Sequence, residues 1–218
     1  MPPQSETVKF VFPARDNLPK VALPEVSIYW YDGGLLPHRP DLLPDGTDLM
    51  RDGLGGCLFV GSKDTMLCDC GGYNPRLLSG RVPYVPQTLR RIPDATGFHD
   101  GFHEQDWIRS CKESPENRTL PFGDFAYAGP FNEMVLLGVL TIRLQALNKT
   151  LLWDGENMQF TNISPNEELA IVSKNDFNII EGHPYMDIKY DRFNALEATA
   201  EYIKHTYREG WGLPDMPA

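Results

Sequence analysis

The sequence predicts an α+β fold, in which helices pack on one face of an open, mainly antiparallel β-sheet to give two layers. Alternating apolar residues typical of strands fill the first half of the chain, whereas the clearest helical periodicity comes later. No strand–helix–strand alternation occurs, so a parallel sheet is disfavoured. With 218 residues the chain is long enough to bury a core, and we predict a single domain over residues 1–218.

Four segments have the pattern of strands or hairpins, because aromatic and β-branched residues alternate with polar ones. They are residues 7–12, 26–32, 57–70 and 149–162. The last two are predicted to be hairpins, one turning at Gly61 to Asp64 and the other at Asp154-Gly155.

Two segments have a helical pattern. In residues 103–114, His103, Trp107 and Cys111 recur at four-residue spacing and so form one stripe. The segment near the end of the chain has the most regular period, and we expect Asp191 to cap its start and Gly210 to follow its end. Its apolar positions are Phe193, Leu196, Ala200, Ile203 and Tyr207.

The most apolar run of the chain, residues 126–145, raises the question of a membrane span. A span needs about 20 apolar residues, but the densest part is 134–147, where Arg143 and Gln145 interrupt it. We therefore predict no membrane span. We expect a helix that begins at Gly129-Pro130, since proline is tolerated in a first turn, and that is buried on most sides.

The formal net charge of −10 excludes some partners. It repels the phosphates of nucleic acids and anionic membrane surfaces, so we expect neither to bind. The first ten residues lack the basic and apolar regions of a secretory signal, and we expect a soluble protein of the cytoplasm or periplasm. Four cysteines are too few for a disulfide scaffold. The pair Cys68 and Cys70 is interpreted as structural rather than metal-binding, because no second pair stands at finger spacing.

Few residues form patterns that carry chemistry. No dinucleotide fingerprint, P-loop, nucleophile elbow or zinc-protease motif occurs. His99, His103 and Asp106 could serve a metal hydrolase, but Asp100-Gly101 is expected to start the helix between the two histidines. His103 more plausibly faces a cleft or packs, with Asp106 able to orient its ring. The interpretation that we favour for Asp106 is a solvated helix acid.

Aromatic and polar residues also gather where the strand 26–32 ends. Trp30 and Asp32 lie close in sequence to Tyr31, His38 and Arg39. Carbohydrate sites combine aromatic faces with carboxylates that bind hydroxyl groups, so these residues are candidates for a sugar site. The alternative is that an aromatic residue at a strand end belongs to the core or to an interface.

Seven motifs in a fixed order resemble the C-terminal region of Gfo/Idh/MocA-type oxidoreductases, in the subgroup common in Bacteroidetes and Planctomycetes. They are FVFPARDNLPKVALPEVSIYWYDGG, GGCLFVGSKDTML, NPRLL, HEQDWIRSCKES, FAYAGPFNEMVLLGVLTIRLQ, LLWDGENMQFTN and YREGWGL. The resemblance covers about residues 7–165 and resumes at about 199–213. The chain also contains a long excursion at 71–101 and an insertion at 168–198, before the last motif.

The resemblance implies an α+β domain that shapes a substrate pocket and supplies an oligomer interface. In this family a separate Rossmann domain binds NAD(P), and the substrates are sugars, polyols or their derivatives, with glycosides cleaved by some relatives. The dinucleotide fingerprint, the E-K-P lysine and the D-x-x-x-H pair of the family map onto no residue of this chain. The resemblance therefore implies no cofactor bound by this chain alone, a Rossmann domain upstream or in trans, a sugar-like ligand and a homo-oligomer formed through the sheet.

By resemblance, four residues are candidates for the substrate pocket: Trp30, Asp32, His103 and Tyr127. No catalytic residue and no metal ligand is assigned. The other residues that match the family motifs are expected to be structural, and they are Trp107, Phe125, Glu133, Trp153, Asp154, Tyr207, Arg208, Gly210 and Trp211. The alternative function is a non-enzymatic module that binds a carbohydrate or a partner subunit and has lost its cofactor domain.

Overall fold

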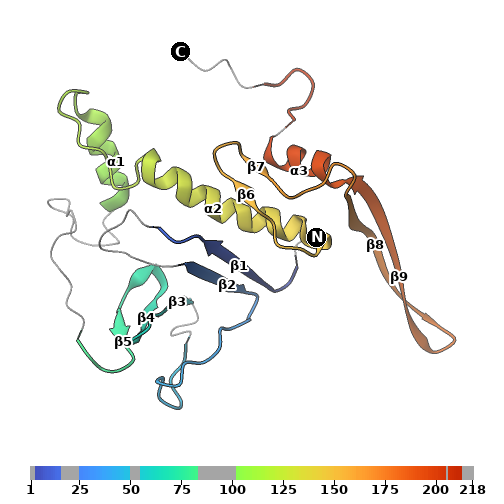
Figure 1. Cartoon of the computed structure of the whole chain (residues 1–218), viewed down its shortest axis with the longest axis horizontal. Helices are drawn as coiled ribbons and strands as arrows, with labels where there is room; N and C mark the ends of the chain where they lie inside the picture. Colours follow the sequence, from blue (N-terminus) through green and yellow to red (C-terminus); the bar gives the residue numbers. More distant parts are fainter. Residues whose placement is uncertain (1–2, 16–24, 50–54, 83–101, 205, 213–218) are drawn as a thin grey trace. The chain divides into compact units, whose positions relative to one another are not determined.

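The computed structural model describes residues 3–15, 25–49, 55–82, 102–204 and 206–212 (Figure 1). The chain divides into two compact units, an N-terminal unit of Pro3–Thr119 and a C-terminal unit that begins at Leu120. Helices and antiparallel strands occur together, so the predicted α+β class is confirmed. The prediction of one open sheet is wrong, because the described strands form four separate sheets of two or three strands. Apolar periodicity reveals the faces of a strand but not which strands pair.

The described part of the N-terminal unit contains two antiparallel sheets, a short 3-10 helix and an α-helix. The strands are β1 (Glu6–Phe12), β2 (Val26–Asp32), β3 (Gly56–Val60), β4 (Thr65–Asp69) and β5 (Arg76–Leu77), and the helices are the short η2 (Cys70–Gly72) and α1 (Phe102–Lys112). β1 pairs with β2, and β4 lies between β3 and β5. The predicted hairpin is confirmed, since the Gly61 N–H donates to the Asp64 carbonyl oxygen at 2.9 Å. Residues 83–101 of the expected excursion lie outside the described residues.

The turn after β2 requires glycine. Gly33 has a φ of 65°, in the left-handed region that favours glycine. A Cβ atom there would lie 2.1 Å from the carbonyl oxygen of Gln4, which precedes β1. The close approach of these two segments fixes the end of the sheet at which Asp32 lies.

The apolar helix α2 spans Phe125–Arg143 and starts earlier than predicted. The Asp124 carboxylate accepts a hydrogen bond from the Tyr127 N–H at 3.0 Å and caps the helix. Pro130 therefore lies inside the helix, where its ring removes one backbone donor. A side-chain cap before Phe125 outweighs the preference of proline for a first turn, and the predicted start at Gly129-Pro130 is wrong.

The expectation that α2 is buried on most sides is also wrong. Phe131 and Leu136 are 52% and 61% exposed, and the helix uses Leu137 and Leu140 to contact the core. Among the described residues, α2 is the helix whose length and composition would suffice to cross a membrane. Because one side of α2 packs on protein, its apolar character serves at least in part to hold the C-terminal unit together.

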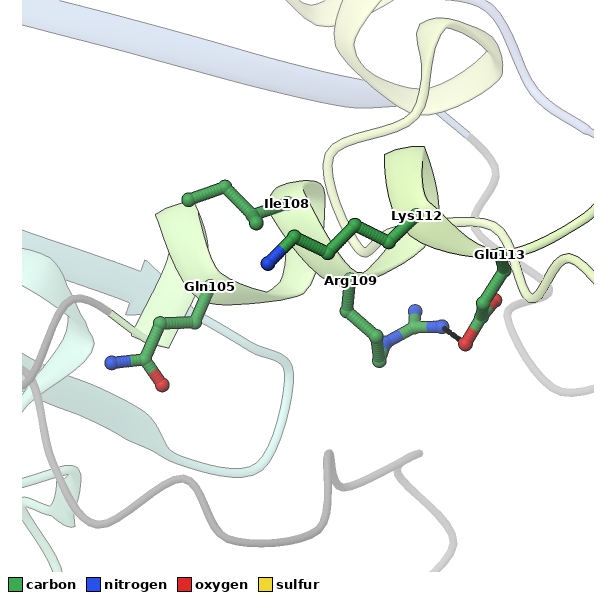
Figure 2. Close-up of a pocket in the computed structure, with 5 residues that line it drawn as sticks. All are labelled: Gln105, Ile108, Arg109, Lys112 and Glu113. Atoms are coloured by element: carbon green, nitrogen blue, oxygen red, sulfur yellow. Dashed lines mark hydrogen bonds and ion pairs between the residues drawn. The ribbon is translucent and has the colours of Figure 1, made fainter.

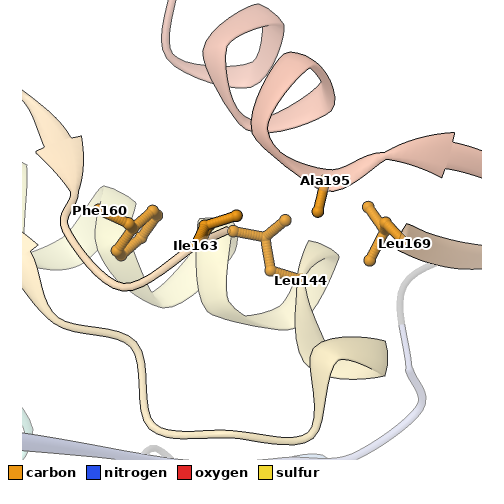
Figure 3. Close-up of a cluster of buried hydrophobic side chains, with 5 residues drawn as sticks. All are labelled: Leu144, Phe160, Ile163, Leu169 and Ala195. Atoms are coloured by element: carbon orange, nitrogen blue, oxygen red, sulfur yellow. The ribbon is translucent and has the colours of Figure 1, made fainter. Parts of the chain in front are cut away.

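The core of the C-terminal unit lies where α2 ends (Figure 3). Leu144 follows α2 and meets Phe160, Ile163, Leu169 and Ala195. These residues come from the short β7 (Gln159–Phe160), the loop after it, β8 (Glu168–Ile180) and α3 (Ala195–Ile203). Leu144 and Leu169 are almost fully buried. The cluster therefore joins the end of α2, the segment from β7 to β8 and the start of α3.

The predicted hairpin at residues 149–162 is confirmed in a shorter form. β6 (Trp153–Asp154) pairs with β7, after the short η4 helix (Gln145–Leu147). Trp153 packs edge-on against Phe160, with ring centroids 4.9 Å apart. This contact extends the core cluster toward the turn.

The insertion expected at 168–198 contains a long two-stranded ribbon, β8 paired with β9 (His183–Asn194). The ribbon leads directly into α3, and Figure 1 shows it extending away from that helix. The predicted cap of the last helix is wrong: Asp191 lies in β9, opposite Ile171. Asn194 caps instead, because its side-chain oxygen accepts a hydrogen bond from the Glu197 N–H at 3.0 Å. Phe193 lies outside the helix because backbone pairing of β9 continues up to the cap. Tyr207 lies outside it because α3 ends at Ile203, so the predicted end just before Gly210 is also wrong.

Candidate functional site

The end of β2 brings together two of the four predicted pocket residues. Trp30 and Asp32 are two residues apart on one strand, so they share a face of the sheet. Trp30 lies opposite the buried Val8 but is itself 58% exposed, which leaves an aromatic surface open to solvent. Asp32 lies opposite Glu6 and accepts a hydrogen bond from the Gly33 N–H at 2.6 Å. A flat apolar ring beside two carboxylates can bind a polyhydroxylated ligand.

The opposite face of the same sheet carries a second aromatic group. The rings of Tyr29 and Tyr31 are stacked with centroids 6.4 Å apart, and the Lys9 ammonium group lies 5.4 Å from the Tyr29 centroid. Lys9 and Tyr29 are direct cross-strand partners. Cation–π contacts of this kind contribute about 0.5–1 kcal/mol at exposed sites. Sequence reasoning missed this group, although the alternation of β1 and β2 indicates it once their pairing is known.

Arg39, expected near the sugar site, has a structural role. Its guanidinium group donates to the carbonyl oxygens of Thr47 at 2.8 Å and Pro44 at 2.5 Å, and more weakly to that of Leu43. These bonds hold the loop after β2 in a compact form around the buried Leu43. The cation is therefore used to satisfy backbone acceptors.

Helix α1 carries His103 in its first turn. The stripe of His103, Trp107 and Cys111 is exposed, with Trp107 at 62%. The buried side of α1 is instead formed by Asp106 and Ser110. The favoured interpretation of Asp106 as a solvated acid is wrong, because its side chain is only 1% exposed. Sequence spacing identified the helix but not the two polar residues that form its buried side.

Asp106 is neutralised by an ion-pair network on its own helix. Arg109 donates to Asp106 at 2.7 Å and to Glu113 at 2.5 Å, and it also reaches the Thr119 carbonyl oxygen at 3.0 Å. The Thr119 N–H in turn donates to Glu113, and this bond together with Arg109 holds the pKa of Glu113 below its usual range. The network ties the residues after α1 back to the helix. Its spacing of three and four residues is the signal that could have revealed it.

A shallow hollow of about 410 Å³ lies along the same helix (Figure 2). It is lined by Gln105, Ile108, Arg109, Lys112 and Glu113. In Figure 2 the Arg109–Glu113 pair borders this hollow. None of the four predicted pocket residues lines it.

Tyr127 lies in the first turn of α2, in the C-terminal unit. Its ring is 64% exposed and stacks on Phe131 with centroids 6.2 Å apart. The other three candidates, Trp30, Asp32 and His103, belong to the N-terminal unit. Of the four, the structure brings together Trp30 and Asp32.

Two of the family-like motifs meet in the C-terminal unit. The indole N–H of Trp153 donates to the Glu133 carboxylate at 2.6 Å, joining the β6–β7 hairpin to α2. Gly155 makes room for this bond, since a Cβ atom there would lie 2.7 Å from the carboxylate oxygen. Asp154 accepts hydrogen bonds from the side chain and N–H of Asn157, which lower its pKa and close the turn. The Trp-Asp pair therefore has a structural role in this turn.

Cysteine residues face one another in the β3–β4 hairpin. Cys57 lies directly opposite Cys68, and both are free thiols. Burial raises the pKa of Cys57, and the neighbouring Cys68 raises it further. Within the described residues, no group of three or more His, Cys, Asp or Glu side chains is placed to hold a metal ion. His99, considered above as a ligand, lies outside those residues.

Within the described residues, no glycine-rich turn leads from a strand into an α-helix. A nucleotide fingerprint needs a glycine-rich turn from a strand into a helix. Among the described residues, β9 is the strand that leads directly into an α-helix, and Asn194 stands at that junction instead of glycine. Helix α2 begins at the carboxylate of Asp124, which would repel a pyrophosphate.

Comparison with models of protein families and with curated proteins finds no match to this chain.

Proposed function

We propose that this chain is the substrate-binding and oligomerisation region of a Gfo/Idh/MocA-like, NAD(P)-dependent oxidoreductase that acts on a sugar, polyol or glycoside. The observation that carries the proposal is the hydrogen bond between Trp153 and Glu133. It joins two of the seven family-like motifs through side chains that the resemblance predicts to be structural. Ordered motifs that also contact one another are better support than motifs that match in sequence alone.

The proposed substrate surface is the end of β2. The Trp30 ring offers an apolar face for the C–H groups of a sugar, and Asp32 offers acceptors for its hydroxyl groups. Both are held on a paired strand whose adjacent turn cannot shift without displacing Gly33 from Gln4. Their role is to bind and orient the ligand. We assign NAD(P) to a dinucleotide-binding domain upstream or in trans, because the sequence of this chain contains no dinucleotide fingerprint.

The test is ligand binding to the chain itself. Saturation-transfer NMR against a panel of hexoses, polyols and aryl glycosides should identify at least one saturable ligand. Trp30→Leu and Asp32→Asn should each raise the dissociation constant of that ligand about tenfold, which corresponds to a loss of about 1.4 kcal/mol in binding free energy. The matched control is Trp211→Leu, because Trp211 is also an exposed tryptophan but lies in the other unit. NAD⁺ and NADP⁺ should show no saturable binding to the chain alone.

Two outcomes would overturn the proposal. A panel with no ligand at millimolar concentration would remove the substrate-binding role. Tight binding of NAD(P) by this chain would contradict the assignment of the cofactor to another domain. A third outcome would favour the non-enzymatic binding module. In that case the chain binds a carbohydrate, its transcript encodes no dinucleotide-binding domain before Met1, and the purified complex contains no such subunit.

A further inference from the structure

The thiols of Cys57 and Cys68 are held together across the β3–β4 ladder. The two residues are direct register partners, and the Cys68 thiol lies 3.7 Å from the carbonyl oxygen of Cys57. Burial raises the pKa of Cys57, and its electrostatic and hydrogen-bond contacts with the Cys68 thiol raise it further. The two side chains are therefore in contact in the folded chain while both thiols are free.

The backbone separation at this pair suits a disulfide bond. Residues directly opposite each other in an antiparallel ladder have Cα atoms about 4.5 to 5.5 Å apart. Disulfides join Cα atoms about 4.4 to 6.8 Å apart, so a bond here needs no large movement of the backbone. The strands also lie close at this point, because a Cβ atom at Gly56 would lie 2.5 Å from the carbonyl oxygen of Cys68.

Strand β3 is the part of this sheet that such a bond would change most. Among the described residues β3 pairs with β4 alone, so it forms one edge of the three-stranded sheet (Figure 1). It is five residues long, and its Phe59 and Val60 are 54% and 77% exposed. A short edge strand with few buried side chains is among the first parts of a sheet to open.

Strand β4 is held more firmly, and it also holds the segment that follows it. Asp69, next to Cys68, accepts hydrogen bonds from the side chains of Asn74 at 2.8 Å and Arg76 at 3.2 Å. The Asp69 N–H donates to the Tyr73 carbonyl oxygen at 2.8 Å. A covalent link at Cys68 would therefore tie the edge strand to a well-anchored part of the sheet.

We propose that Cys57 and Cys68 form a redox-sensitive site, in which exchange with a disulfide of the glutathione class reversibly creates a cross-strand bond that clamps β3 to β4. The exposed Cys57, as its thiolate, attacks one sulfur of the external disulfide and releases one thiolate. Cys68, as its thiolate, then attacks the Cys57 sulfur of the mixed disulfide and releases the second. The two released thiolates take up the two protons that the cysteines lost. Two cysteine thiols are thus oxidised, and the external disulfide is reduced to two thiols.

The exposure of Cys57 makes the bond reversible in the folded chain, because an external thiol can attack its sulfur. Cys70 is the competing thiol of the same hairpin. It is also exposed, but it lies in η2, beyond the last ladder pair of Gly56 and Asp69, so it has no register partner on β3. Cys70 therefore provides a matched control for Cys57.

Equilibration of the full chain in mixtures of oxidised and reduced glutathione tests the proposal. Samples are quenched with acid and mapped by peptide mass spectrometry. In the oxidising mixture the wild type should gain a disulfide that joins the peptides containing Cys57 and Cys68. Hydrogen exchange in β3 should then slow at least about tenfold, because the bond restrains the opening of the edge strand. Return to reduced glutathione should reverse both changes.

Two variants check the assignment made by the peptide map. Cys70→Ser should form the same disulfide and show the same slowing of exchange, whereas Cys57→Ser should show neither. Glutathione adducts without an intrachain bond in the wild type would overturn the proposal, as would an intrachain disulfide that persists in Cys57→Ser. A Cys57–Cys68 bond that leaves exchange in β3 unchanged would overturn the clamp. A bond that reduced glutathione cannot open would overturn its reversibility.

Discussion

Asp64 shows how one side chain can organise a hairpin. Its carboxylate accepts hydrogen bonds from the Thr65 N–H at 2.8 Å, from Arg81 at 2.8 and 3.1 Å, and from the hydroxyl and N–H of Ser79. It therefore joins the β3–β4 turn to the segment after β5. Hydrogen bonds from Ser79 and Arg81 lower the pKa of Asp64 from 3.8 to about 2. The residue predicted only as part of a turn is the centre of a network.

The pH dependence of this network is predictable. Because the folded pKa lies below the ordinary value, Asp64 stabilises the fold above about pH 4, and this contribution is lost as pH falls toward 2. Asp64→Asn should therefore lower the free energy of unfolding at pH 6 and differ little from the wild type near pH 2. Urea unfolding from pH 6 to 2 measures this. The control is Asp45→Asn, at an exposed loop residue. The prediction would be contradicted if Asp64→Asn lowered the free energy of unfolding by the same amount at every pH.

At the scale of elements, side-chain caps determine where α2 and α3 start. Asn194 both accepts from the Glu197 N–H and donates to the Pro165 carbonyl oxygen at 2.6 Å. It thus fixes the junction between β9 and α3 and ties it to the loop before β8. Asp191, a suitable cap by residue type, is committed to the ladder of the ribbon. Strand pairing therefore moves the cap from Asp191, which the sequence pattern indicates, to Asn194.

A pair of variants distinguishes the two caps. Asn194→Ala should lower the free energy of unfolding by about 1 kcal/mol, with up to about 2 kcal/mol when the Pro165 contact is included. Asp191→Ala should change it by less than about 0.5 kcal/mol, since this exposed residue serves no cap. Chemical denaturation followed by far-ultraviolet circular dichroism measures both. A larger loss for Asp191→Ala would restore the earlier helix start.

At the scale of the whole molecule, local patterns were predictable and long-range pairing was not. The hairpins at Gly61–Asp64 and Asp154-Gly155 follow from turn residues between alternating strands, and the structure confirms both. The prediction of a single sheet was wrong because each described strand pairs only with strands next to it in sequence. Of the candidate site, the shared strand predicts that Trp30 and Asp32 lie together. The burial of Asp106 could not be predicted, because it depends on which side of α1 meets the rest of its unit.

Division into two units predicts separable responses to core substitutions. Leu67 is buried in the N-terminal unit and Leu169 in the C-terminal unit. Replacing either by alanine should cost about 2–5 kcal/mol within its own unit. Hydrogen exchange followed by mass spectrometry should then show loss of protection in β3 and β4 for Leu67→Ala, and in β8 and α3 for Leu169→Ala. Loss of protection across the whole chain in either variant would indicate a single cooperative unit.

The facing thiols of the β3–β4 hairpin have a consequence for oxidative chemistry. A thiol reacts with peroxides and alkylating agents as its thiolate, and the raised pKa of Cys57 lowers that population at neutral pH. Its cross-strand partner Cys68 is buried, so reagents have little access to it. The hairpin thus keeps two thiols adjacent, an exposed Cys57 with a raised pKa and a Cys68 that is buried. Chemical labels aimed at this chain would accordingly mark the exposed Cys111 on α1 before this pair.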